Sequence, residues 1–281
     1  MSQARILSTG SYVPERVVTN TEMDIHIYPD AASLAQAAAE YFVSVAAESM
    51  SAHGDCAVML SGGSTPRAVH ARLAEDDLAG RVEWGRVHVF WGDERCVPPD
   101  HPDSNYRMAR ETLLERVPIP GENIRRIRGE IGPAQAALEY ERVMRGFFDQ
   151  AHERHPASRP AYARRHPPSF DLILLGMGDD GHTASLFPGT AALRETTRWA
   201  AAVEHMQPPP PLVARVTITP VVLNAAAHVA FIVSGAAKAE RLRQVLSDPY
   251  QPDLLPAQIV RPAGGQVTWL VDEPAAAGLG K

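Results

Sequence analysis

A histidine and two carboxylates follow a short apolar run in the segment FDLILLGMGDDGHTASLFPG, residues 170–189. The run Leu172–Leu175 ends in a glycine-rich turn that carries Asp179, Asp180 and His182, and a helix-compatible segment comes next. Histidine has a suitable intrinsic pKa for taking a proton from water near neutral pH, and a carboxylate beside it stabilises the imidazolium that forms. We therefore expect His182 to act as a general base supported by Asp180 or Asp179. A metal site is less well supported, because no other ligand lies at short spacing from His182.

A second segment, SGGSTP at residues 61–66, follows an apolar run and opens a predicted helix. Gly62 and Gly63 let backbone N–H groups turn toward a ligand, and Ser64 and Thr65 stand where the helix N-terminus offers free donors and partial positive charge. This is the outline of a phosphate cradle. The GK[ST] ending of a nucleotide P-loop is absent, and an ordinary strand-to-helix turn remains the alternative.

Charged residues follow other predicted strands. Arg95 is of the type that holds a phosphate or carboxylate with two hydrogen bonds, and Asp93 and Glu94 precede it as groups for sugar hydroxyls or for orienting Arg95. Lys238 begins a predicted helix, where it opposes the helix dipole unless an anion is bound nearby. Arg215 is a further candidate cation. The alternatives are a surface ion-pair cluster and an exposed lysine.

Strands alternate with helices along most of the chain. Strands are predicted at 26–28, 57–60, 87–91, 172–175, 213–219, 228–234 and 267–270, and helices at 31–50, 66–78, 105–117, 134–150, 221–227 and 236–247. The alternation predicts an α/β fold, a single three-layer domain whose mostly parallel central sheet has helices on both faces. Since the carboxyl ends of parallel strands lie at one edge, the cradle, the cations and the histidine should converge there. Together they predict an enzyme that acts on a small phosphorylated, polyhydroxylated substrate by proton transfer.

Composition agrees with a globular protein. The 281 residues are 45% hydrophobic and 21% charged, with a net charge of −6 that gives no argument for nucleic-acid binding. The two cysteines, Cys56 and Cys96, form no CxxC motif, which is usual for idle thiols in a cytosolic protein. No apolar run is long enough to cross a bilayer, and the N-terminus lacks the pattern of a signal peptide. We expect a cytoplasmic protein that is a monomer or small homo-oligomer.

Six segments, in order, resemble the 6-phosphogluconolactonase family. They are LSGGSTPR at 60–67, FWGDERCVP at 90–98, SNYRMARETLL at 104–114, GMGDDGHTASLFPG at 176–189, RVTITP at 215–220 and VSGAAKA at 233–239. The resemblance implies hydrolysis of 6-phosphogluconolactone to 6-phosphogluconate, in the oxidative pentose phosphate pathway, without a metal or cofactor. It also implies an α/β fold related to that of glucosamine-6-phosphate deaminase.

Carried over to this sequence, the resemblance makes His182 the general base and Asp180 its supporting carboxylate. Arg95 and Lys238 match the cations that hold the phosphate or the developing oxyanion, and the backbone at 62–65 matches the phosphate end of the pocket. The nearest alternative is a sugar-phosphate isomerase or deaminase on the same fold. That relative reads HIAFNEP after the histidine, where this chain has HTASLFP with Phe187. A non-catalytic sugar-phosphate sensor is the other alternative, although no DNA-binding module is visible.

Two segments depart from the family pattern. Residues 1–25 are expected to form an arm of unclear origin, in which residues 6–20, ILSTGSYVPERVVTN, resemble the N-terminus of beta-ketoacyl-acyl-carrier-protein synthase III. The catalytic domain is then expected to span 26–281. Within it, residues 151–168 are rich in proline and arginine, which indicates a solvated loop insertion outside the catalytic core.

Overall fold

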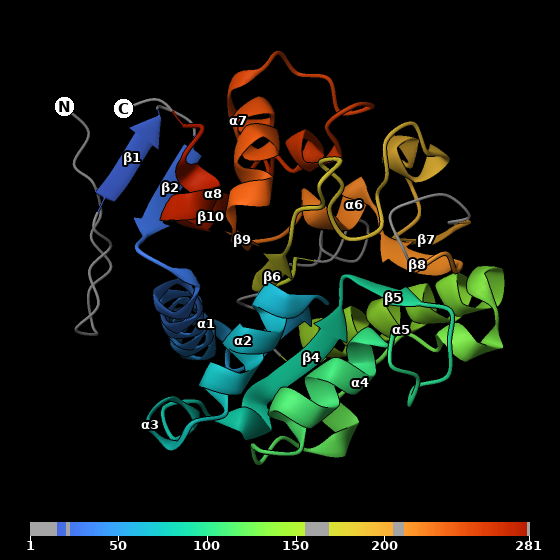
Figure 1. Ribbon diagram of the computed structural model, residues 1–281. Coiled ribbons are helices and arrows are strands. Elements are labelled where there is room, and N and C mark those ends of the chain that lie inside the picture. The colour runs from blue at the N-terminus through green and yellow to red at the C-terminus, as the bar shows by residue number, and fades with distance from the viewer. Residues whose placement is uncertain (1–15, 21–22, 155–168, 205–210, 280–281) are drawn as a thin grey trace.

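The computed structural model describes residues 16–20, 23–154, 169–204 and 211–279. Ten strands within these residues form a seven-stranded sheet, ordered β1-β2-β10-β9-β6-β3-β4, and a three-stranded sheet, ordered β5-β8-β7 (Figure 1). The large sheet contains β1 (Arg16–Asn20), β2 (Met23–Tyr28), β3 (Cys56–Leu60), β4 (Val87–Trp91), β6 (Leu172–Leu175), β9 (His228–Val233) and β10 (Gln266–Asp272). Its strands pair in parallel except for β1, which is antiparallel to β2. The small sheet, of β5 (Asp93–Arg95), β7 (Ala200–Val203) and β8 (Arg215–Ile218), is antiparallel.

The central strands of the large sheet are short and apolar because both of their faces are covered. Every residue of β3 and of β6 is buried. A parallel strand that is covered on both sides reads as a continuous apolar run rather than as an alternating pattern. The runs at 57–60 and 172–175 are therefore the sequence signature of the middle of the sheet.

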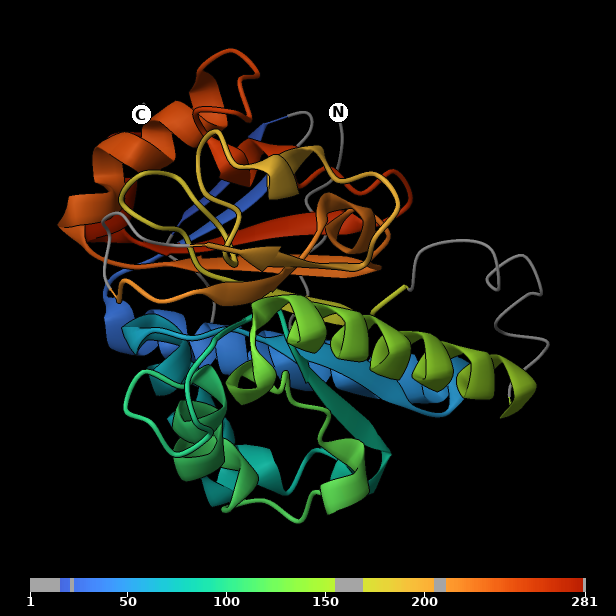
Figure 2. The ribbon, with the colours of Figure 1, turned by 90° about the vertical axis from the view of Figure 1, so that its right-hand side faces the viewer.

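The large sheet has helices on both faces. The helices among the described residues are α1 (Ala31–His53), α2 (Ser64–Leu73), α3 (Asp76–Ala79), α4 (Asn105–Ala109), α5 (Pro133–Arg154), α6 (Pro220–Leu223), α7 (Ala239–Ser247) and α8 (Glu273–Ala276). Figure 2 shows α1 beneath the strands and α7 above them. Helix α1 begins where Asp30 accepts a hydrogen bond from the Ser33 N–H, and it ends at Gly54, whose φ of 96° is left-handed. The predicted three-layer α/β fold is confirmed.

Some predicted boundaries were wrong. The helix expected at 66–78 is divided into α2 and α3, and the helix expected at 105–117 continues after α4 as the π-helical turn Arg110–Leu114. The segment directly after His182 forms turns rather than the expected helix, and a 3-10 turn begins only at Ala191. The small sheet was not expected, and the strand predicted at 213–219 belongs to it as β8. Strands β5 and β7 were missed because three or four residues are too few to show an alternating pattern.

The two unusual segments fall partly among the described residues. Strand β1 and the first residues of β2 come from the expected N-terminal arm, so part of that arm pairs with the sheet. The division of the chain at residue 25 stays a prediction. Helix α5 continues to Arg154, so it takes in the first residues of the expected 151–168 loop. Residues 1–15 and 155–168 lie outside the described residues.

Candidate active site

Four neighbouring strands deliver the predicted site residues to one edge of the large sheet. Strands β9, β6, β3 and β4 lie side by side and run parallel. Their carboxyl ends lead into the segments that contain Lys238, His182, the cradle at 61–65 and Arg95, respectively. The loop of His182 follows β6, which lies between β9 and β3. It is therefore flanked by the segments of Lys238 and of the cradle, as expected for a site at the carboxyl edge of parallel strands.

His182 is held by Asp180 in a geometry suited to a general base. The Nδ1 atom of His182 lies 2.5 Å from Oδ1 of Asp180, and the backbone N–H of His182 donates to the same oxygen at 3.0 Å. Burial opposes ionisation of Asp180, but the hydrogen bonds and charge of His182 lower the pKa of that carboxyl below its ordinary value. Since an ionised carboxylate only accepts hydrogen bonds, Nδ1 carries the proton, and Nε2 is left as the basic atom.

A glycine makes room for this imidazole. A Cβ atom added to Gly178 would lie 2.1 Å from Nδ1 of His182 and 2.8 Å from Oδ1 of Asp180. The backbone N–H of Gly178 also donates to the carbonyl of His182 at 2.8 Å. The GxGDDGH turn thus closes on itself, and Gly178 is required because the imidazole lies where a side chain would be.

Phe187 connects the base to a buried arginine. Its ring centroid lies 4.4 Å from that of His182, and Cζ of Arg215 lies 5.3 Å from the same ring. The Arg215 side chain is only 4% exposed, and burial lowers its pKa; the charge of Asp180 acts in the opposite direction. The loop after β6 and the small sheet therefore meet around Phe187.

Two arginines are cross-strand neighbours in the small sheet. Arg95 on β5 lies directly opposite Arg215 on β8. Like charges in such a position are unfavourable, and the charge of Arg95 contributes to lowering the pKa of Arg215. Among the described residues, the Nε atoms of both arginines are buried and have no hydrogen-bond partner. Two neighbouring cations with unused buried donors are the arrangement that an anion would stabilise.

Lys238 and the cradle complete the edge. Lys238 ends a 3-10 turn before α7, and its Nζ lies 2.5 Å from Oδ1 of Asp179. Asp179 therefore pairs with Lys238, while Asp180 pairs with His182. In the cradle, Gly63 precedes α2 with a φ of 107°, a conformation that L side chains rarely adopt, and Ser64 opens the helix.

The family of the chain follows from comparison with known proteins. A family profile described as glucosamine-6-phosphate isomerases/6-phosphogluconolactonase matches residues 29–269. The chain belongs to this family. It is 38% identical over 256 residues to a 6-phosphogluconolactonase of Nostoc sp., covering 91% of this chain and 98% of that relative. It is 39% identical over 243 residues to a probable chloroplastic 6-phosphogluconolactonase 3 of Oryza sativa subsp. indica, covering 86% and 72%. The solved structure of 6-phosphogluconolactonase from Trypanosoma brucei superposes with a TM-score of 0.79 at 29% identity, covering 92% and 99%.

The two acidic residues before Arg95 are buried, and their carboxylates accept hydrogen bonds from other groups of the protein. Asp93 is 5% exposed and Glu94 3%. The Glu94 carboxylate accepts hydrogen bonds from four groups, namely the backbone N–H groups of Arg95, Asn105 and Tyr106 and the hydroxyl of Ser104. It thereby ties β5 to the N-terminus of α4. Burial raises the pKa of Glu94 to about 7, although these donors act against the rise.

Asn105 is a site residue that the sequence reasoning missed. Its side-chain amide donates to the carbonyl of Asp93 at 3.0 Å and to Oδ1 of Asp93 at 3.3 Å. A Cβ atom added to Gly62 would lie 1.8 Å from Oδ1 of Asn105, so the amide packs directly against the cradle backbone. The segment SNYR carried a family resemblance, but nothing in its composition indicated a contact with residues 43 positions earlier.

Within the described residues, no group of three or more histidines, cysteines, aspartates or glutamates could hold a metal ion. No helix among these residues is long and apolar enough to cross a membrane.

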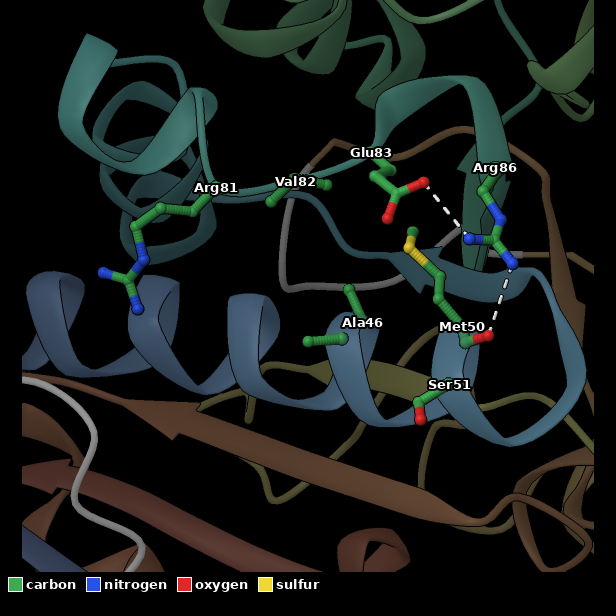
Figure 3. A pocket seen from close by; sticks show the side chains of 8 residues that line it. Ala46, Met50, Ser51, Arg81, Val82, Glu83 and Arg86 are labelled. Atoms are coloured by element: carbon green, nitrogen blue, oxygen red, sulfur yellow. Dashed lines mark hydrogen bonds and ion pairs between the residues drawn. The ribbon is translucent and has the colours of Figure 1, made fainter.

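A hollow of about 200 Å³ lies away from this site (Figure 3). It lies near the starts of β3 and β4, at the end of the sheet opposite to the candidate site. Arg86 there donates to the carbonyl of Met50 at 3.3 Å and pairs with Glu83 at 3.1 Å, while Arg81 pairs with Glu40 at 2.8 Å. The cations around this hollow are thus already matched, and it contains no residue of the candidate site.

Proposed function

We propose that the protein hydrolyses 6-phospho-D-glucono-1,5-lactone to 6-phospho-D-gluconate, a step of the oxidative pentose phosphate pathway. The observation that carries this proposal is the His182–Asp180 pair at the sheet edge where Arg95 and Arg215 leave buried donors unused. A general base beside an anion-binding group fits a substrate that has both a phosphate and a carbon centre open to attack by water. The membership of the family and the names of the relatives support the choice of substrate.

In the proposed mechanism, Nε2 of His182 takes a proton from water, and the oxygen of that water attacks the lactone carbonyl carbon. A cation or backbone donor stabilises the negative charge that develops on the carbonyl oxygen. The bond between that carbon and the ring oxygen then breaks, and the imidazolium returns its proton to the ring oxygen. Asp180 keeps the imidazole oriented throughout and stabilises its charged form. The steps use neither a metal nor a cofactor, and no serine is required as a nucleophile.

We assign the phosphate to Lys238 and the backbone at Gly62, Gly63, Ser64 and Thr65, together with Arg95 or Arg215. Lys238 has an ion-pair partner, Asp179, that is 75% exposed, and such a pair is easily exchanged for a phosphate. Location in the cytoplasm, the absence of a nucleic-acid partner and a monomeric or small oligomeric state stay predictions; some relatives have names that include the word chloroplastic.

The isomerase or deaminase alternative is less favoured by the site. Moving protons between adjacent carbons calls for further polar groups around the histidine. The ring of Phe187 lies against His182 instead. The sensor alternative would not require a carboxylate-supported base.

The test is lactone hydrolysis, measured above the spontaneous rate, with wild type, His182→Ala and a matched control, His228→Gln. His228 lies at the start of β9, away from the carboxyl edge, and its ring contacts the Tyr41 hydroxyl. Loss of the base should lower kcat by about 10²- to 10⁴-fold, while the control should stay within about twofold. If His182→Ala keeps wild-type activity, His182 is not the general base. If the wild type is inactive, the proposed function is wrong.

Two further measurements separate binding from chemistry. Lys238→Ala should raise KM by roughly tenfold or more, because a hydrogen bond to a charged group contributes about 1.5–3 kcal/mol. Activity should survive exhaustive treatment with a chelator. A loss of activity that a divalent ion restores would overturn the metal-free mechanism.

A further inference from the structure

We propose that Asp93 and Ser185 form a positioning pair that fixes the loop of His182 to the strand of Arg95, and that Asp93 does not contact substrate. The pair would set the distance between the base and the cations during lactone hydrolysis. This inference rests on the proposed function. Neither residue would act on the reacting atoms.

The contact between the two residues is short and buried. The hydroxyl of Ser185 donates to Oδ2 of Asp93 at 2.5 Å, and the two residues are 0% and 5% exposed. The backbone N–H of Ser185 donates to the hydroxyl of Thr217 at 3.1 Å. Thr217 lies directly opposite Asp93 across β5 and β8. Both hydrogen bonds of Ser185 thus end on one cross-strand pair of the small sheet.

The residue before Ser185 shows that the loop needs this anchor. Ala184 has a φ of 47°, the left-handed region that is unfavourable for a residue with a Cβ. Such a conformation persists only where the surroundings hold it. On the other side, the hydroxyl of Thr183 donates to the carbonyl of Gly176 at 2.9 Å. The segment from His182 to Ser185 is therefore fixed on both sides, to the turn after β6 and to the small sheet.

The other contacts of Asp93 leave neither carboxylate oxygen available to a substrate. Asn105 donates to Oδ1 of Asp93 at 3.3 Å, and Nη1 of Arg215 lies 4.0 Å from Oδ2. Both carboxylate oxygens are engaged in a position that is almost closed to solvent. A group for sugar hydroxyls would need an open oxygen, so the contacts favour a role in position.

Breaking the pair should affect kcat rather than KM. Without its anchor, the loop is free to relax at Ala184, and the imidazole then shifts relative to the cations. A displacement of about 1 Å at reacting groups costs about 10²-fold in rate. In Ser185→Ala the phosphate would still bind, because the cations and the cradle keep their contacts.

The experiment is a double-mutant cycle of Asp93→Ala and Ser185→Ala in the lactone assay, with melting temperatures. Each single variant should lower kcat by roughly 10- to 100-fold, and KM of Ser185→Ala should stay within about threefold of wild type. The double variant should be no slower than the slower single variant, because both changes remove the same link. Asp93→Asn should recover most of kcat, since its amide can donate to Ser185 while its oxygen accepts from Asn105.

Thr112→Val is the matched control, since it removes a buried hydroxyl that donates to the carbonyl of Met108 within one helix. It should keep kcat even where its melting temperature falls as far as that of Ser185→Ala. If Asp93→Ala does not fold, Ser185→Ala and Asp93→Asn complete the comparison.

The inference is overturned by any of three outcomes. They are unchanged kcat in Ser185→Ala, additive effects in the double variant, or a large rise in KM with kcat unchanged in Asp93→Ala. The third would make Asp93 a substrate ligand. Each of them requires an active wild type, so each is distinct from failure of the proposed function.

Discussion

The two sheets contribute to the candidate site in opposite ways. The large sheet presents His182, Lys238 and the cradle on loops that follow buried apolar strands. The small sheet carries Arg95 and Arg215 within its own strands, facing each other in register. In the large sheet, the strands hold only the ends of the loops, and the loops themselves carry the site residues. In the small sheet, the pairing of two strands fixes the cations directly.

Burial of polar groups distinguishes the sheets further. Strands β3 and β6 bury only apolar side chains. The small sheet buries Asp93, Glu94 and Arg215, which is costly unless each group is hydrogen-bonded or paired. Its carboxylates are satisfied by the N-terminus of α4 and by the loop of Ser185, while the two arginine Nε atoms are not satisfied by any described residue. The large sheet thus stabilises the fold by burying apolar side chains. The small sheet instead holds two buried arginine donors that a bound anion would satisfy.

The largest effect is expected from a methyl group in the loop of the large sheet. Gly178→Ala would place a Cβ on the imidazole of His182, so that the histidine must leave Asp180. We expect kcat to fall about 10²- to 10⁴-fold, as for loss of a general base, with little change in melting temperature. Gly176→Ala is the matched control, because no atom of the described residues lies within 4 Å of its added Cβ. Equal activity of the two variants would contradict the described position of His182.

One buried titratable group near each sheet should change the stability with pH, and the two changes should have opposite signs. The groups are His70 on α2 and Glu94 on β5. His70, on the helix that follows the cradle, is 0% exposed, and neither ring nitrogen has a hydrogen-bond partner among the described residues. Burial, with a smaller effect from Arg67, lowers its pKa from 6.5 to about 4. The unfolded chain therefore binds a proton that the folded chain does not, and stability falls as the pH drops from 6.5 to 4.

Glu94, on the small sheet, behaves in the reverse sense. Its pKa rises from 4.5 to about 7, so the folded state keeps a proton that the unfolded state loses, and stability falls as the pH rises from 4.5 to 7. Each group should contribute on the order of 3 kcal/mol across its window. Urea unfolding between pH 4.5 and 7 checks this. Stability of His70→Leu should fall less toward acid than that of wild type, and stability of Glu94→Gln should fall less toward neutral pH. Identical slopes in all three proteins would refute both assignments.

The junction of the two sheets should show an intermediate effect. Gly62→Ala would press on the Asn105 amide and disturb its hydrogen bonds to Asp93. We expect a loss of stability of about 1–3 kcal/mol, with a higher KM because the cradle shifts. Equilibrium unfolding and steady-state kinetics check this. A variant with both values unchanged would show that the cradle and the small sheet are not coupled through Asn105.

The smallest effect is expected at Ala184. Glycine adopts a positive φ at no steric cost but gains freedom in the unfolded chain, so the two contributions nearly cancel. Ala184→Gly should change the free energy of unfolding by less than about 1 kcal/mol. Activity should stay within about threefold if the two hydrogen bonds of Ser185 hold the loop. A large loss of activity would mean that the stiffness of Ala184 itself positions His182.

The sequence predicted those parts of the site that are local. His182 and Asp180 are two residues apart, so their hydrogen bond follows from one turn. A mostly parallel sheet was expected to gather the strand ends at one edge, and β9, β6, β3 and β4 do lie side by side in the fold. The pairing of Arg95 with Arg215 could not be predicted, because it joins short strands that are far apart in the chain and carry no alternating pattern. The contacts of Asn105 with Gly62 and of Ser185 with Asp93 were missed for the same reason.

The sequence by itself determined the α/β fold, because apolar runs act over a few residues, and it predicted a carboxylate-supported base and a phosphate cradle from two glycine-rich turns. Only the tertiary structure decided which acid serves which cation. It paired Asp179 with Lys238 and engaged Asp93 with Ser185. These choices depend on how strands from distant parts of the chain align. The hydrogen bond of 2.5 Å between Ser185 and Asp93 could not be predicted from local sequence patterns, because the two residues are 92 positions apart.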